Sequence, residues 1–179
     1  NTIYVAGSKG YICKSIDGGL TFNLCTSAPM LPSFYLGSPV VQDCWSIHFI
    51  TPLAGVVGMQ NNFMMTSDGG VTWNPCCGGN GIEQSSPGFP NPGRIYGIHV
   101  DVTSQIVVCT GQNIIARTTN AGTNFSLVYT WAGNNGTHLT WETDLRLWAM
   151  GIKGERIRSI DGGITWTILN AYSLAGPSH

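Results

Sequence analysis

The chain has 179 residues, of which 9% are Asp, Glu, Lys or Arg, and its formal net charge is -1. Its 8 basic residues give no positive surface for a phosphate backbone, and no apolar run reaches the roughly 18 residues of a membrane span, so we expect neither nucleic-acid binding nor membrane insertion. The 24 Gly and 9 Pro favour short strands and tight turns, which predicts an all-β fold.

One eight-residue pattern recurs four times along the chain. It reads SIDGGLTF, TSDGGVTW, TTNAGTNF and SIDGGITW, and its third position is held by Asp17, Asp68, Asn120 and Asp161. These positions are about 40 to 50 residues apart, which is the length of one blade of a β-propeller. The spacing therefore predicts a small propeller of four blades.

A strand-like segment that ends near a glycine precedes each turn. Gly7, Gly58 and Gly151 all lie ten residues before the Asp of their turn, so the repeat extends over the whole blade. Further upstream, residues 45–49, 95–100 and 138–141 alternate as half-buried strands do. We predict four-stranded antiparallel blades, located approximately at residues 1–25, 44–76, 94–130 and 137–170.

The first blade lacks the segment that would form its first strand, whereas residues 171–179 are left over after the fourth blade. We therefore predict that this tail completes the first blade and closes the ring. The alternative is an open array that pairs with another copy or another chain. The start at Asn1, with no Met, fits a mature product or a fragment.

The residue types of the pattern suit a tight turn between two outer strands. An Asp side chain accepts hydrogen bonds from backbone N–H groups of the turn, Gly supplies a positive φ, and Thr adds a second side-chain hydrogen bond. We expect a structural role for Asp17, Asp68 and Asp161, and for Asn120 in the most degenerate turn. The ligand series of a calcium loop is missing, so we predict no metal site.

These turns resemble the Asp-box, or BNR, repeats of sialidases, of sortilin-type receptors and of photosystem II assembly and stability factors. The last group is the most similar, notably over residues 45–73, and the likeness covers essentially the whole chain. The resemblance implies a β-propeller. It implies little about activity, because the same turn occurs in proteins of many functions.

The cysteines are even in number and lack the CxxC spacing of a zinc site, which favours disulfides and an oxidising compartment. Cys13 and Cys25 flank the first turn almost symmetrically about Gly19, so we predict a cross-strand bridge between them. The sequons at Asn124 and Asn135 fit the same compartment, and Asn135 is the better glycan acceptor. The six cysteines are Cys13, Cys25, Cys44, Cys76, Cys77 and Cys109.

The sequence contains few side chains that could form a known catalytic site. A sialidase needs an arginine cluster, a tyrosine nucleophile and an acid/base carboxylate, and the segment Gly93-Arg94-Ile95-Tyr96 resembles its arginine motif but follows the second turn. No GxSxG elbow occurs, and the carboxylates outside the turns show no acid/base spacing. His48 and His99 hold comparable first-strand positions, so we expect them near the axis as strand residues and not as metal ligands.

Two long connections, residues 26–43 and 75–93, carry the most unusual composition. The apolar run with Met30, Leu31, Phe34 and Tyr35 is the candidate binding loop, because exposed aromatic side chains are typical of contact surfaces. A loop that covers the blade edge is the alternative.

We expect a secreted or lumenal, non-enzymatic module that uses no cofactor and binds protein or glycan, as a binding or structural scaffold. Its low surface charge also favours self-association into a homo-oligomer. The alternatives are an assembly factor for a membrane complex and a sialidase-like glycosidase remnant.

Overall fold

The structure is a computed structural model that describes residues 1–25, 42–60, 62–75, 93–101, 105–120, 124–131 and 136–169. Some of the expectations above fall on other residues and stay predictions. Outside the described residues lie the loop with Met30, Leu31, Phe34 and Tyr35, the acceptor Asn135, the pair Cys76 and Cys77, and the tail 171–179.

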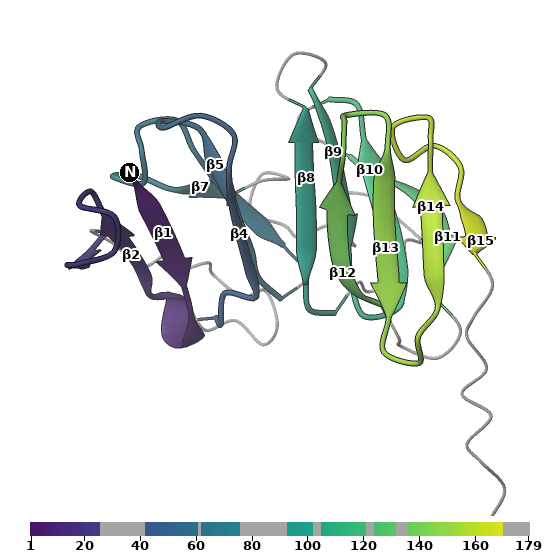
Figure 1. The fold of residues 1–179 in the computed structure, drawn as a ribbon, viewed down its shortest axis with the longest axis horizontal. Helices are drawn as coiled ribbons and strands as arrows, with labels where there is room; N and C mark the ends of the chain where they lie inside the picture. Colours follow the sequence, from purple (N-terminus) through teal and green to yellow (C-terminus); the bar gives the residue numbers. More distant parts are fainter. Residues whose placement is uncertain are drawn as a thin grey trace, which may run out of the picture.

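The described residues form four antiparallel sheets and almost no helix, so the all-β prediction is confirmed (Figure 1). We number the sheets as blades in chain order. Blade 1 contains β1 (Ile3–Ala6), β2 (Ile12–Ser15) and β3 (Asn23–Leu24), with the 3-10 helix η1 (Ser8–Gly10) after β1. Blade 2 contains β4 (Ser46–Phe49), β5 (Gly55–Gly58), β6 (Phe63–Thr66) and β7 (Asn74–Pro75). Blade 3 contains β8 (Gly97–Asp101), β9 (Ile106–Thr110), β10 (Ile114–Thr118) and β11 (Ser126–Thr130), and blade 4 contains β12 (Gly136–Trp141), β13 (Leu147–Gly151), β14 (Arg156–Ser159) and β15 (Thr167–Leu169). Among the described residues, no helix has the length and apolar character needed to cross a membrane.

Blade 1 has three described strands where the other blades have four. Its β1 pairs with β2 as β5 pairs with β6, so β1 holds the position of a second strand. The described part of blade 1 thus contains no counterpart of the first strands β4, β8 and β12. The tail expected to replace it lies outside the described residues, and ring closure through the tail stays a prediction.

The hydrogen bond after each second strand shows which residues are equivalent between blades. Its backbone N–H donor is Gly7, Met59, Gly111 or Gly151 in blades 1 to 4. Gly58 is therefore not the counterpart of Gly7 and Gly151, although all three lie at the same distance from their turns. The alignment by constant spacing is wrong for blade 2, because the connection between its second and third strands is shorter than in blade 1.

The blades follow one another in a row, with blade 1 and blade 4 at opposite ends (Figure 1). Along the inner side, β1 contacts β4, β4 contacts β8, and β8 contacts β12. Side chains alternate along a strand, so each sheet has two faces. We call the face toward the preceding blade the receiving face and the face toward the next blade the donor face.

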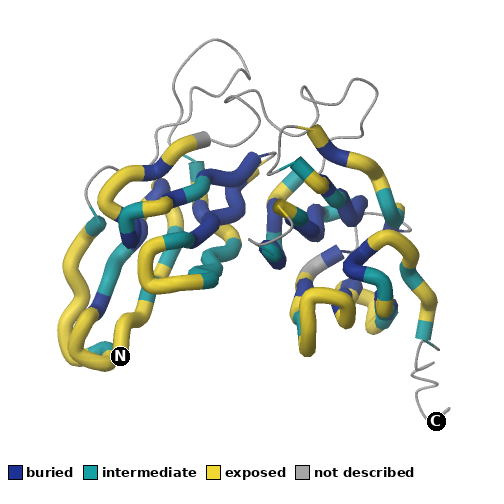
Figure 2. Tube along the Cα trace, turned by 90° about the horizontal axis from the view of Figure 1, so that it is seen from above, coloured by how far each residue is buried: buried dark blue, intermediate teal, exposed yellow. Residues whose placement is uncertain are grey.

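Apolar clusters fill the three junctions between blades, and exposed residues follow the outer rim (Figure 2). Val57 and Val56 are neighbours in β5 and both are fully buried, but Val57 packs toward blade 1 and Val56 toward blade 3. A sheet inside the row is thus buried on both faces, and the core consists of the layers between sheets. The main members of these layers are Ile12, Met64 and Trp73, then Phe63, Ile98 and Val107, then Ile115, Leu147 and Ile157.

The turns between third and fourth strands share one hydrogen-bond pattern. Ser15 Oγ donates to Asp17 Oδ1 over 2.7 Å, and Thr21 donates to the same carboxylate through its N–H (3.0 Å) and its hydroxyl (2.6 Å). The turns at Asp68 and Asp161 repeat these contacts. In the third turn, Asn120 accepts from Thr118 and exchanges hydrogen bonds with Asn124.

Two turns are also held by a basic side chain from the donor face of the preceding blade. Lys14 Nζ donates to the carbonyl of Gly69 over 3.2 Å, and Arg117 Nε donates to that of Gly162 over 2.9 Å. Both donors stand three residues before the Asp or Asn of their own turn. The same position is Met65 in blade 2 and Arg158 in blade 4.

The predicted bridge between Cys13 and Cys25 is wrong. Cys13 pairs with Leu24, whereas the N–H of Cys25 donates to the carbonyl of Ile12. Successive residues of a strand point to opposite faces, so Cys13 and Cys25 project from different sides of the sheet. Cys13, Cys25 and Cys44 are free thiols, and burial raises the pKa of the Cys44 thiol to about 11.

The turn carboxylates make the fold sensitive to acid. Hydrogen bonds from Thr72, with smaller help from Thr66 and Val71, lower the pKa of Asp68 to about 2. Burial acts to raise the pKa of Asp161, but hydrogen bonds from Thr165 and Ser159 prevail and lower it to about 2. A carboxyl with a lower pKa in the folded chain adds stability above its unfolded pKa, and that stability is lost as the pH falls from about 4 toward 2.

We expect the double substitution Asp68→Asn, Asp161→Asn to flatten the decrease in unfolding free energy between about pH 4 and pH 2, because neither turn then has a proton to take up. Urea unfolding at several pH values measures this slope. Glu142→Gln, at an exposed carboxyl outside the turns, is the control. A double variant with the same acid slope as the parent protein would contradict the assignment.

Candidate axial binding site

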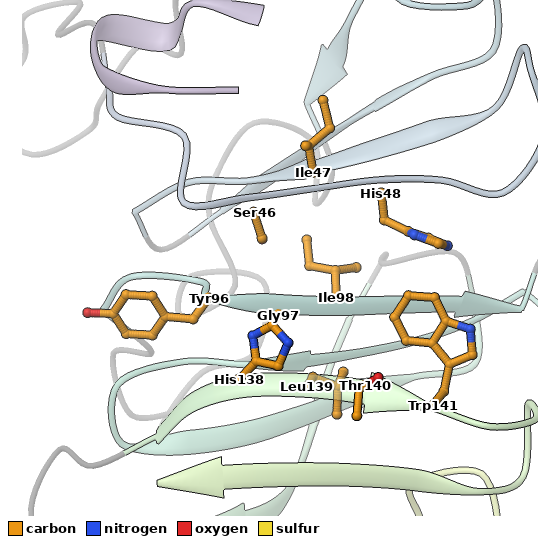
Figure 3. Close-up of a pocket in the computed structure, with 10 residues that line it drawn as sticks. All are labelled: Ser46, Ile47, His48, Tyr96, Gly97, Ile98, His138, Leu139, Thr140 and Trp141. Atoms are coloured by element: carbon orange, nitrogen blue, oxygen red, sulfur yellow. The ribbon is translucent and has the colours of Figure 1, made fainter. Parts of the chain in front are cut away.

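The first strands of three blades enclose a pocket of about 240 Å³ on the inner side of the row (Figure 3). Residues of β4 form one wall, and residues of β8 and β12 form the other. Because the strands belong to different blades, the pocket exists only when the blades are stacked. Its lining residues are Ser46, Ile47, His48, Tyr96, Gly97, Ile98, His138, Leu139, Thr140 and Trp141.

Gly97 lets β8 and β12 approach each other at the pocket. A Cβ at this position would lie 2.6 Å from the backbone nitrogen of Leu139 and 2.9 Å from Thr110 Oγ1. Both distances are shorter than side-chain contacts normally allow. The close contact of β8 and β12, which together form one wall of the pocket, therefore depends on the missing side chain at Gly97.

We expect Gly97→Ala to lower the free energy of unfolding by about 1 to 3 kcal/mol, as overpacking of a well-filled site does. Gly7→Ala is the matched control, since a Cβ there meets nothing within 4 Å and its φ of -154° suits any residue. Urea denaturation gives both values. Equal losses in the two variants would show that the close approach at Gly97 is not the cause.

One end of the pocket is aromatic. The His48 ring meets Trp141 edge-on, with 4.4 Å between ring centroids, and the His99 ring lies tilted against the same indole at 4.8 Å. Figure 3 shows His48 pointing toward Trp141 at one end of the pocket, with Tyr96 and His138 nearer the other end. Three blades thus bring one tryptophan and two histidines into contact.

His99 is almost completely buried, whereas its acidic neighbour is in solvent. Nε2 of His99 lies 3.3 Å from Asp144 Oδ1, and the two side chains are 3% and 63% exposed. Burial lowers the pKa of His99, while Asp144 and, more weakly, Asp101 act to raise it. Burial and the nearby His99 also lower the pKa of His48. At neutral pH the two imidazoles are therefore uncharged, and His48, which lines the pocket, gives it a neutral hydrogen-bonding group.

We expect Asp144→Asn to lower the pKa of His99 further, because it removes the negative charge that favours the imidazolium. NMR titration of the imidazole signals measures the shift. In the control Glu142→Gln, the altered side chain is a partner of Arg146 at 3.6 Å and not of His99. A His99 pKa that responds to both substitutions alike would argue against a specific contact with Asp144.

The structure brings together only some of the residues that the sequence singled out. His48 lines the pocket on the inner side of the row, and His99 packs against Trp141 beside it. The four turn residues, Asp17, Asp68, Asn120 and Asp161, do not line the pocket. The guanidinium carbon of Arg94, from the arginine-like motif, lies 4.3 Å from the centre of the Trp45 ring. In the residue ranges that the structure describes, no cluster of three or more His, Cys, Asp and Glu side chains could hold a metal ion.

Sequence reasoning missed Trp141 and Tyr96. Each stands in or beside a first strand, in the segments that were recognised as alternating strands. No local pattern marks these two residues, because Trp141 meets the two histidines, and Tyr96 meets Trp45, only when separate blades stack. The one available signal was that all of these segments hold the same position in the repeat.

No family model matches the sequence, and no curated protein matches it. Solved structures that match it are β-propellers, which confirms the predicted fold class. YCF48 bound to D1 peptide is 19% identical with a TM-score of 0.53, covering 70% of this chain and 39% of that one. YCF48 from Cyanidioschyzon merolae is 14% identical with a TM-score of 0.53, covering 94% of this chain and 69% of that one. A GH74 xyloglucanase from Xanthomonas campestris is 16% identical with a TM-score of 0.65, covering 95% of this chain and 28% of that one.

At these identities the likeness shows the fold alone. The chain spans 39% of the YCF48 chain solved with the peptide and 28% of the xyloglucanase. The matched part of this chain therefore corresponds to a part of each of these two propellers.

Proposed function

We propose that this chain is a non-catalytic propeller module that binds a segment of a partner protein in the pocket between β4, β8 and β12. The observation that carries the proposal is the aromatic end of the pocket, where His48 and His99 pack on Trp141. Tryptophan combines a large apolar surface with a polar N–H, and it is enriched where proteins bind one another. A YCF48 protein of similar fold has been solved with a D1 peptide, which supports a peptide as the ligand class.

The size of the pocket limits what enters it. A volume of about 240 Å³ is below the roughly 300 Å³ at which sites for drug-sized ligands begin. One large side chain fits this space, and so does one sugar ring. We favour a peptide that inserts a single side chain against Trp141, with a glycan as the alternative ligand.

Five of the described acidic side chains are already engaged by other groups, which favours binding over catalysis. Asp17, Asp68 and Asp161 are occupied within their turns. Glu142 pairs with Arg146, and Asp144 faces His99. A glycosidase needs two carboxyl groups that face each other across the bond to be cleaved. A glycosidase remnant stays the alternative, and turnover of a fluorogenic sialoside or of xyloglucan would favour it.

The proposal includes an Asp-box ancestry for the four turns and a secreted or lumenal location. The low charge and the two sequons, at Asn124 and Asn135, support that location. Glycans found at these positions by mass spectrometry of the native protein would favour it over the alternative of an assembly factor for a membrane complex. Unmodified asparagines would favour that alternative.

The test is selection of binders from a phage-displayed library of random peptides, followed by calorimetry with the best synthetic peptide. We expect Trp141→Ala to weaken that peptide at least tenfold, about 1.4 kcal/mol, because truncating a central aromatic anchor costs this much or more. Tyr11→Ala is the control, since Tyr11 is an exposed aromatic residue outside the pocket. A peptide that binds the Trp141→Ala and Tyr11→Ala variants equally well would show that the pocket is not its binding site.

A further inference from the structure

The two ends of the row present unlike faces. Blade 1 has its receiving face outward, and blade 4 has its donor face outward. Within the row, a donor face always packs against a receiving face. The two outer faces are therefore of the types that pack together at each of the three junctions.

The receiving face of blade 1 is apolar and exposed. Val5 is 49% exposed and Phe22 is 45% exposed. In blade 2 the same positions are held by Val57 and Trp73, which are 0% and 9% exposed. The pattern extends to Ile3, which is 39% exposed, whereas its blade 4 counterpart Leu147 is 0% exposed. This face has the composition of a junction core, and such exposed apolar patches mark contact sites.

The donor face of blade 4 carries the basic residue that holds a turn at other junctions. Arg158 corresponds to Lys14 and Arg117, which donate to the carbonyls of Gly69 and Gly162 in the next blade. Here the guanidinium lies 5.6 Å from the centre of the Trp148 ring on the same face. An arginine beside a half-buried tryptophan is a frequent composition of protein interfaces.

The turn that would receive Arg158 is at the other end of the row. Gly18 is the counterpart of Gly69 and Gly162, and a Cβ placed on it meets nothing within 4 Å. The turn also carries Asp17, whose pKa is held well below its ordinary value by hydrogen bonds from Thr21 and Ser15, so it is ionised at neutral pH. A cationic donor face and an anionic receiving turn are complementary in charge.

We propose that two copies of this chain associate head to tail, with the donor face of blade 4 in each copy packed on the receiving face of blade 1 in the other. Arg158 then donates to the carbonyl of Gly18 in the second copy, and Val5 and Phe22 become buried. One row cannot make this contact with itself in the arrangement seen here, because blades 1 and 4 lie at opposite ends of the longest axis (Figure 1). Two such contacts, related by a twofold axis, use both outer faces of each copy.

The mass in solution, measured by light scattering after gel filtration over a range of concentrations, tests the association. We expect a discrete species of twice the chain mass. We expect Arg158→Glu and Val5→Lys each to raise the concentration at half-dissociation at least tenfold. The controls Lys153→Glu and Ile164→Lys introduce the same residue types at exposed positions outside the two faces. They should leave the concentration at half-dissociation unchanged.

A mixture of the two variants distinguishes a head-to-tail contact from a self-complementary one. An equimolar mixture of Arg158→Glu and Val5→Lys contains one junction in which both faces are native, so it should dimerise more tightly than either variant alone. A self-complementary interface would give no such recovery. A single-chain mass at all concentrations, a mixture no tighter than its components, or equal losses in the controls would each overturn the proposal. Circular dichroism of each variant confirms that it is folded.

Discussion

The fold depends on the burial of every sheet face by the neighbouring blade. Val56 and Val57 are adjacent in β5 and both are completely buried, although they face opposite junctions. Burial of one such side chain contributes about 1.5 to 3 kcal/mol, and a single small sheet cannot obtain it on both sides. The strands are therefore stable as a stack, and the contacts made by Lys14 and Arg117 connect one blade to the turn of the next.

Local chemistry made the turns predictable. The Asp–Gly–Gly run and the Thr that follows it close their own hydrogen bonds, so their identity and spacing were readable without tertiary information. The same reasoning failed where a connection changed length. Gly58 is displaced from Gly7 because the link after the second strand is shorter in blade 2, and one residue of shift moves a side chain to the other face. The Cys13–Cys25 prediction failed because Cys13 pairs with Leu24, so Cys25 lies one residue further along and on the opposite face.

The pocket was only partly predictable. The shared repeat position of His48 and His99 indicated that they would lie near the axis, but Trp141 joins them from a third blade. Its role depends on how closely β8 and β12 approach, which Gly97 permits and which no sequence pattern records. The low pKa of both histidines likewise follows from stacking, since the main cause is burial.

The junction between blades 2 and 3 differs from its neighbours in one respect. Met65 stands where the flanking junctions have Lys14 and Arg117, and Asn120 stands where the facing turns have an aspartate. Both charges are missing together, and Met65 packs instead against the apolar cluster formed with Phe63 and Val107. Acid protonates the turn carboxylates and salt screens charged groups, but both act little on apolar contacts. The middle of the molecule should therefore keep its amide hydrogens protected from exchange under conditions in which the outer blades have begun to fray.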